Sequence, residues 1–317
     1  MKVPKRISDL INQKQEYIES RSNGLNRIIL RYQDKLLSEV LNKVIPELEV
    51  VNGIIVDNVR NMRILQTLDK VYRDFSNKNY GMIGDHVSRT TAGIGSLTKK
   101  YYSITLGEVP DYFTDAIKST KELLNLRIGN DVSGGFMQKL IKNETLNNDI
   151  RERLSSAIVG RKPLKDLITE LNETITGAGV KEGGLEYQVR RYAGDIYRQY
   201  DRAYNLVLAR RLGLTYFIYQ GGIIKDSRDF CVAHNNKVWT IEESKAWSAW
   251  TPAVSKKRGD FPAGYEIQQK NLNVTPGYMG YAGYNPLVDL GGYNCRHVLG
   301  YIRESLAIRM RPELKKE

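Results

Sequence analysis

Hydrophobic residues recur at helical spacing through the first two thirds of the chain. From Leu25 onward they step by three or four residues, which places them on one face of a long amphipathic helix. This stripe consists of Leu25, Ile29, Tyr32, Leu36, Val40 and Val44. Pro46 ends or kinks the helix, because proline lacks the backbone N–H and clashes with the preceding turn. Similar stripes predict further helices at 58–75, 83–102, 111–126, 136–141 and 146–159.

The last third of the chain begins with the clearest helical pattern, at residues 187–212. Tyrosines and small apolar residues line one face, and arginines occupy other positions. We interpret these arginines as a solvated surface, as is usual on an exposed helix. They are Arg190, Arg191, Arg198, Arg202, Arg210 and Arg211. Beyond this helix, aromatic and β-branched residues predict strands at 215–219 and 298–302.

Two short local signals lie between the predicted strands. Asn235 and Asn236 separate two short apolar runs, which indicates a hairpin turn. Thr240 and Glu243 have the spacing of a capping box, in which each residue satisfies a backbone N–H of the other at the start of a helix. A short helix is therefore predicted to begin after Thr240.

Together these patterns predict an α+β fold in two parts. Residues 1–180 are expected to form a mainly helical region, and residues 181–317 a small, loop-rich α+β domain. A chain of 317 residues is long enough for two domains. Its content of 41% hydrophobic and 26% charged residues is that of an ordinary globular protein.

The chain is basic, with 48 Lys and Arg against 36 Asp and Glu and a net charge of +12. This favours a polyanionic neighbour such as nucleic acid, an acidic protein surface or anionic lipid. The excess is spread along the chain, so a generally basic solvated surface explains it as well as a DNA site does. No apolar run approaches the length that spans a bilayer, and residues 1–10 lack the apolar region of a secretory signal. We therefore expect synthesis in a cytosol and no membrane partner.

The only two cysteines of the chain each have a histidine close by. Cys231 and His234 form Cys-x-x-His, and Cys295 and His297 form Cys-x-His. Two thiolates and two imidazoles are the donor set of a structural zinc site. A tight turn can present the first pair to one ion, and residues i and i+2 of a strand share a face. The sequence therefore predicts that these four residues bind Zn²⁺.

Two other states of the thiols stay open. A disulfide between Cys231 and Cys295 would close the same long loop, although a cytosolic origin disfavours it. Two free buried thiols fit the pattern as well, because buried cysteine behaves as a small apolar residue. Nothing marks either cysteine as a nucleophile with an oriented base. In each of these three states the two cysteines lie close together in the fold.

The motifs of the C-terminal third follow one another in a recognisable order. A helix contains Arg-Tyr-Ala-Gly-Asp-Ile-Tyr-Arg at 191–198, and a strand leads into Lys-Asp-Ser-Arg-Asp-Phe-Cys at 225–231. The turn Asn-Lys-Val-Trp-Thr follows at 236–240, and Gly-Gly-Tyr-Asn-Cys-Arg-His at 291–297 closes the series. This order resembles the phage Mu F-like minor head proteins, also called head morphogenesis proteins. Both cysteines and Arg296 occupy motif positions of that family.

The resemblance implies a structural virion component, present in few copies at the portal vertex in the capsid interior. Such a protein supports head assembly, DNA packaging or DNA ejection. Its partners would be the portal protein, which the helical region would help to dock, a capsid or scaffolding protein, and packaged DNA. The positive charge fits DNA bound without sequence preference. No catalytic residue is carried over, because the family is not defined by one.

An enzyme is the alternative function, either an ADP-ribosyltransferase-like effector or a metal-finger nuclease. The resemblance implies a fold related to the transferases. However, the Glu-x-Glu at Glu47 and Glu49 lies far N-terminal, which is the wrong order for their site. A nuclease could use His234 and Asn235, but the further histidine and carboxylates that hold a hydrolytic metal are missing. The chain also lacks Walker A, Gly-x-Gly-x-x-Gly and His-Glu-x-x-His patterns, so no catalytic residue is predicted.

Overall fold

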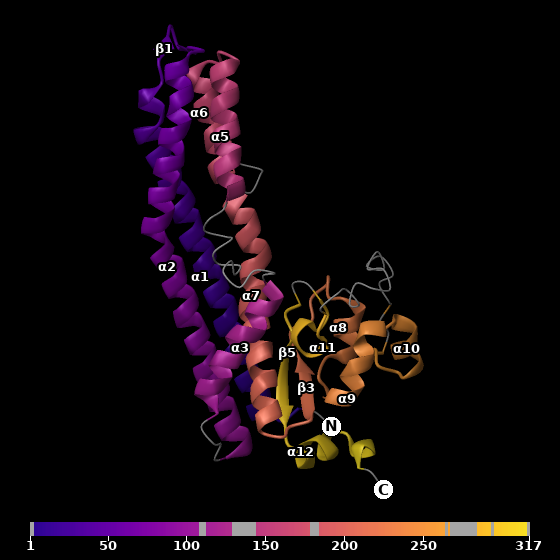
Figure 1. Cartoon of the computed structure of the whole chain (residues 1–317). Helices are drawn as coiled ribbons and strands as arrows, with labels where there is room; N and C mark the ends of the chain where they lie inside the picture. The colour runs from indigo at the N-terminus through magenta and orange to yellow at the C-terminus, as the bar shows by residue number, and fades with distance from the viewer. Residues whose placement is uncertain are drawn as a thin grey trace. The chain divides into compact units, whose positions relative to one another are not determined.

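The computed structural model describes residues 3–107, 112–128, 144–177, 184–263, 266, 284–292 and 295–315. Its long helices are α1 (Lys5–Lys43), α2 (Val59–Leu106), α3 (Phe113–Ile128), α5 (Glu144–Val159), α6 (Leu164–Thr176) and α7 (Gly184–Arg211), labelled in Figure 1. The mainly helical N-terminal region is thus confirmed, while the helix expected at 136–141 lies outside the described residues. None of the helices in this described part combines the length and apolar character needed to cross a membrane.

Helix α1 shows how the sequence pattern becomes a buried face. Each residue of the stripe from Leu25 to Val44 is at most 2% exposed. The helix ends at Lys43, and Pro46 stands inside the short 3₁₀ turn Ile45–Glu47 that follows. The predicted stripe is confirmed, and the helix ends shortly before Pro46, as the proline predicted.

The chain forms two compact units, each assembled from separated segments. The first unit comprises Met1–Ser20, Thr90–Ile128 and Gly194–Glu317, and the second comprises Arg21–Arg89 and Gly129–Ala193. This grouping differs from the sequence-based division near residue 180, because the chain's start belongs with its C-terminal part. Helices α1, α2 and α7 each contribute residues to both units.

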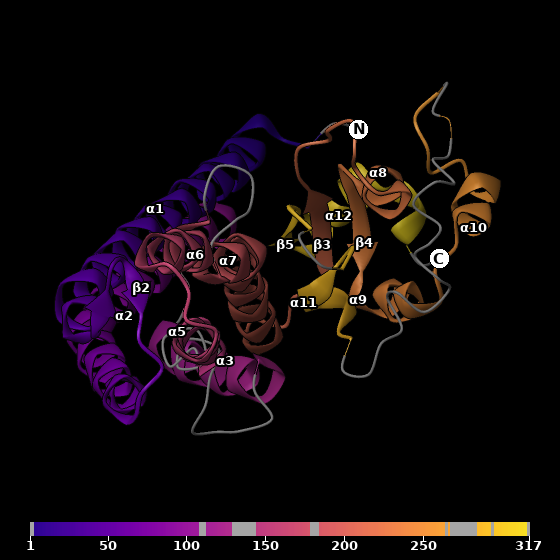
Figure 2. The same ribbon diagram turned by 90° about the horizontal axis from the view of Figure 1, so that it is seen from above.

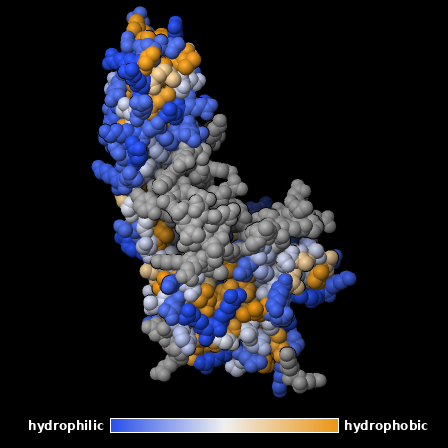
Figure 3. Space-filling model, in the orientation of Figure 1, coloured by the Kyte–Doolittle hydropathy of each residue, from blue (hydrophilic) through white to orange (hydrophobic). Residues whose placement is uncertain are grey.

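The second unit carries a small β-hairpin at one end. Strands β1 (Val50–Val51) and β2 (Ile54–Ile55) pair antiparallel. Exposed apolar residues of this end are Val51, Ile54 and Val159. Apolar colour marks the same end in Figure 3.

The first unit contains a three-stranded antiparallel sheet in the order β4–β3–β5. The central strand β3 (Tyr216–Gln220) pairs with β4 (Lys237–Thr240) on one side and with β5 (Val298–Ile302) on the other. Figure 2 shows the three strands side by side. Both sequence-predicted strands are confirmed. Strand β3 therefore has a hydrogen-bonded neighbour on each edge.

Short helices surround this sheet. They are α8 (Asp229–His234), α9 (Ile241–Ser244), α10 (Pro252–Lys257), α11 (Pro286–Asp289) and α12 (Glu304–Met310), with 3₁₀ turns at Lys245–Ala249 and Pro312–Leu314. The predicted capping box is confirmed at α9. There the Thr240 hydroxyl accepts from the Glu243 amide at 3.0 Å, and the Glu243 carboxylate accepts from the Thr240 amide at 2.9 Å.

The hairpin turn predicted at Asn235 and Asn236 is wrong. The residues before it form the helix α8, so the turn joins a helix to a strand. Strand β4 pairs with β3 instead. The apolar run around Cys231 was too short to distinguish a buried helix from a strand by periodicity.

Polar contacts inside the first unit join helices to one another and to the sheet. The Lys14 ammonium of α1 lies 2.8 Å from the Asp201 carboxylate of α7, and their side chains are 4% and 0% exposed. The Tyr101 hydroxyl of α2 donates to the Tyr301 carbonyl of β5 at 3.1 Å. A buried ion pair is costly to break, because the remaining charge has no solvent to compensate it.

Candidate metal centre

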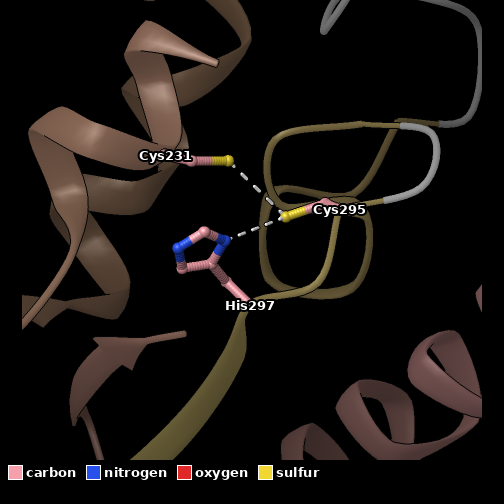
Figure 4. Close-up of side chains that lie close together, drawn as sticks. All are labelled: Cys231, Cys295 and His297. Atoms are coloured by element: carbon pink, nitrogen blue, oxygen red, sulfur yellow. Dashed lines mark hydrogen bonds between the residues drawn. The ribbon is translucent and has the colours of Figure 1, made fainter. Parts of the chain in front are cut away.

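Three of the four sequence-predicted ligands meet in the first unit. The sulfurs of Cys231 and Cys295 lie 3.7 Å apart, and Nδ1 of His297 lies 3.7 Å from the Cys295 sulfur. All three ligand atoms lie within 4.8 Å of one another, and all three residues are buried. Figure 4 shows the two thiols and the imidazole pointing toward one another. The prediction that the two cysteines lie close together is confirmed.

Local structure explains where each of the three ligand side chains points. Cys231 stands in the middle of α8, whose residues are all buried. Cys295 and His297 precede and adjoin β5, where alternate residues share a side. Arg296, between them, is exposed and therefore points away from the site. The two side chains point toward each other, as the i, i+2 spacing predicted, but both residues precede β5 and do not stand on a strand.

His234 does not join the group. Its Nδ1 lies 2.7 Å from the Phe230 carbonyl, and its ring stacks on Phe230 at 4.0 Å and on Trp239 at 4.5 Å between centroids. Trp247 lies edge-on to the same ring at 4.8 Å. Burial lowers the pKa of His234 to about 3, so the ring is neutral. Its contacts with the Phe230 carbonyl and with the rings of Phe230, Trp239 and Trp247 place His234 in an aromatic cluster beside the three-residue group.

Tyr219 of β3 completes the surroundings of the two sulfurs. Its hydroxyl lies 3.4 Å from the Cys231 sulfur and 3.5 Å from the Cys295 sulfur. Its ring stacks on the His297 ring with centroids 4.8 Å apart. Burial and then the neighbouring thiols raise the pKa of Tyr219 well above its usual range, so its hydroxyl keeps its proton without a cation nearby. The sequence reading assigned no role to this tyrosine.

The two cysteines differ in their electrostatics. The hydrogen bond with Cys295, followed by burial, raises the pKa of the Cys231 thiol. Burial opposes ionisation of Cys295 as well, but hydrogen bonds with Cys231 and His297 and the charge of Arg202 outweigh it and hold the pKa of Cys295 well below its usual range. Ionisation is therefore favoured at Cys295 over Cys231, and the thiolate is the form of cysteine that binds metals.

Arg202 of α7 holds the segment that carries Cys295 and His297. Its guanidinium donates to the His297 carbonyl at 2.9 Å, to the Val288 carbonyl at 3.1 Å and to the Cys295 carbonyl. The residue is 1% exposed, so interpreting it as part of a solvated arginine surface is wrong. From Tyr197 to Ala209 nearly every residue of α7 is buried, and its polar residues are internal. Helical periodicity alone does not reveal a helix that is covered on all sides.

Two glycines leave room for the site. A Cβ on Gly291 would lie 2.7 Å from the Cys231 sulfur and 3.5 Å from the Cys295 sulfur. A Cβ on Gly221 would lie 2.6 Å from the His297 ring. Neither glycine has a positive φ, so the backbone conformation would allow a side chain at either position. The obstacle is steric, because an added Cβ would clash with the neighbouring ligand residues.

The distances between the ligand atoms suit a small tetrahedral cation. With metal–sulfur bonds of about 2.3 Å and metal–nitrogen bonds of about 2.0 Å, a tetrahedron has a sulfur–sulfur edge of about 3.8 Å and a sulfur–nitrogen edge of about 3.5 Å. The Cys231–Cys295 sulfur distance and the distance from the Cys295 sulfur to His297 Nδ1 are both 3.7 Å, and the third distance is within 4.8 Å. The buried group of Cys231, Cys295 and His297 could therefore hold a metal ion.

Comparison with known proteins adds no further constraint. No family model matches the chain, and no curated protein or solved structure is similar enough to be matched to it. The resemblance to the Mu F-like family therefore depends on the motif residues themselves.

Proposed function

We propose that this chain is a structural phage minor head protein whose C-terminal part is held together by one zinc ion. One observation carries the proposal. The two segments that best resemble the Mu F-like family, 225–231 and 291–297, meet where their cysteine sulfurs lie 3.7 Å apart. These segments are far apart in the sequence. Their contact in the fold means that a single structural role, holding the two segments together, can account for both motifs.

Zinc is the metal that the donors favour. Thiolate and imidazole are soft or borderline ligands, and their tetrahedral arrangement is that of structural zinc. Calcium and magnesium prefer oxygen ligands and higher coordination numbers. An ion at this position would join α8 to the segment before β5 and so close a unit that is rich in loops. The whole contribution of the ion is then to folding.

A catalytic role for the same group is disfavoured by burial. Cys231, Cys295 and His297 are each at most 3% exposed, and a substrate needs access to the reacting sulfur. A reactive cysteine normally stands in a partly exposed, electropositive environment. The non-enzymatic function is therefore preferred to the transferase and the nuclease.

The virion role is proposed for the interior of the capsid, at the portal vertex, with the portal protein, a capsid or scaffolding protein and packaged DNA as partners. The net charge of +12 supports a polyanionic neighbour. Mass analysis of purified particles of the phage that encodes the chain tests this role directly. We expect the chain at low copy number and in association with the portal. Its absence from particles would refute the proposal.

The zinc site has its own test. Elemental analysis of the purified full-length chain is expected to find about one zinc per chain, as for a closed structural site. Cys231→Ser and Cys295→Ser are each expected to lose it. Chain without metal and with both thiols alkylated only after unfolding would instead identify free buried thiols. Thiols that react only after reduction would identify a disulfide.

A further inference from the structure

We propose that the phenol oxygen of Tyr219 is the fourth ligand of the metal ion, so that the site is a closed set of two cysteines, one histidine and one tyrosine. This inference rests on the zinc site proposed above. It identifies the fourth ligand, which the two cysteines and His297 do not supply. A structural zinc site is almost always four-coordinate, and only three such donors meet here among the described residues.

The position of the hydroxyl carries the argument. In a tetrahedral site with a metal–oxygen bond of about 2.0 Å, the oxygen lies about 3.5 Å from each sulfur. The Tyr219 hydroxyl lies 3.4 Å from the Cys231 sulfur and 3.5 Å from the Cys295 sulfur. These two oxygen–sulfur distances therefore match the expected tetrahedral edges. They add to the sulfur–sulfur and sulfur–nitrogen distances of 3.7 Å described above.

The tyrosine is also fixed in place. It stands on the central strand β3, which is paired on both sides. Its ring stacks on His297 and meets Phe230 and Trp247 edge-on, at 5.9 Å and 5.8 Å between centroids. The residue is fully buried, at 0% exposure. A donor held in this way needs little reorganisation to bind an ion.

Charge balance favours an anionic fourth ligand. Two thiolates neutralise a divalent cation and leave the buried guanidinium of Arg202 as an additional positive charge beside the site. A phenolate from Tyr219 would offset the charge of this guanidinium, and a buried charge costs less when it is paired. On binding, the O–H bond of Tyr219 breaks, its proton passes to the solvent buffer, and an oxygen–metal bond forms.

His234 is the competing fourth donor that the sequence predicted. Its Nδ1 is engaged with the Phe230 carbonyl at 2.7 Å, and its ring lies between aromatic side chains. Its Nε2 is buried without a hydrogen-bond partner among the described residues, but His234 is not among the residues whose ligand atoms lie within 4.8 Å of one another. The Tyr219 hydroxyl already lies 3.4 Å and 3.5 Å from the two sulfurs.

The test is a titration of the metal-free full-length chain with Zn²⁺ alone. Near-ultraviolet difference absorption follows the conversion of tyrosine to tyrosinate, and a weakly buffered solution with an indicator counts released protons. We expect one tyrosinate per bound zinc. Tyr219→Phe keeps the ring packing but is expected to lose the tyrosinate signal, to release one proton fewer per zinc and to bind at least about tenfold more weakly.

Tyr301→Phe is the matched control. Tyr301 is also fully buried, stands on the adjacent strand β5, and its hydroxyl has no hydrogen-bond partner among the described residues. This variant is expected to retain the full signal, the full proton count and the wild-type affinity.

Two results would overturn the inference, and they differ in what they say of the zinc site. Stoichiometric zinc binding without a tyrosinate signal would leave Tyr219 as a hydrogen-bond donor to the thiolates and would keep the site. No zinc binding by the wild-type chain would reject the site and the inference together. If Tyr219→Phe does not fold, the wild-type titration alone decides, because the signal is measured without the variant.

Discussion

Gly291→Ala is the substitution that tests the site most directly. The added methyl would lie 2.7 Å from the Cys231 sulfur, 3.3 Å from the Phe230 ring and 3.5 Å from the Cys295 sulfur. Non-bonded heavy atoms prefer separations of about 3.5–4.0 Å, so Cys231 must move by roughly 1 Å. The backbone at Gly291 has no positive φ, so strain of the main chain does not contribute.

The expected cost follows from how firmly the neighbours are held. Cys231 stands in a buried helix, and the methyl would insert between the two sulfurs and their aromatic cover. Adding one carbon to a well-packed core typically costs about 1–3 kcal/mol. A displaced sulfur would also stretch an edge of the proposed metal tetrahedron. We therefore expect zinc affinity to fall by about 10- to 100-fold, since each factor of ten corresponds to about 1.4 kcal/mol.

Tryptophan fluorescence is a suitable probe of unfolding. The only tryptophans of the chain are Trp239, Trp247 and Trp250, and all three lie in the first unit around His234. Denaturant midpoints followed in this way report on the part of the fold that holds the site, even if the two units unfold separately. Zinc affinity is measured in parallel by competition with a chromophoric chelator.

Gly222→Ala is the matched control. It lies in the same unit, has no heavy atom within 4 Å of an added Cβ, and has no positive φ. We expect it to leave both the unfolding midpoint and the zinc affinity unchanged. If Gly291→Ala behaves like Gly222→Ala in both measurements, the close approach of the Gly291 backbone to the thiols is refuted.

Three further predictions concern the same unit. Lys14→Met leaves the buried Asp201 carboxylate without its cation and should lower stability by about 3–5 kcal/mol in denaturant unfolding; a loss below about 1 kcal/mol would contradict the buried pair. Burial lowers the pKa of His234 from 6.5 in the unfolded chain to about 3 in the fold. Between these two pH values only the unfolded chain binds the proton. The free energy of unfolding therefore falls as the pH drops through this range, by up to about 1.4 kcal/mol per pH unit. His234→Phe should remove this share of the acid sensitivity, and an unchanged stability–pH profile would argue against the buried neutral ring. Thr240→Ala removes the side-chain acceptor of the capping box with Glu243 and should cost about 1 kcal/mol by the same unfolding assay, whereas Thr240→Ser should cost little.

Local patterns in the sequence determined most of the secondary structure. The apolar stripe from Leu25 to Val44, the end of α1 shortly before Pro46 and the capping box at Thr240 are each set by residues a few positions apart. Such features depend on backbone geometry and repeat spacing, and these are the same in any fold. The short run at Cys231 was read wrongly because a few apolar residues fit a buried helix and a buried strand equally well.

The sequence by itself also determined that the two cysteines belong together, since a disulfide, a metal site and a pair of buried thiols all require it. Only the tertiary structure decided which side chains surround them. Tyr219 lies 76 positions before Cys295, and Arg202 lies 93 positions before it. Contacts over such separations depend on how helices and strands pack and on which side chains that packing buries. Residue spacing along the chain predicts neither the packing nor the burial. For the same reason His234, only three positions from Cys231, packs among aromatic rings while a distant tyrosine lies beside both sulfurs.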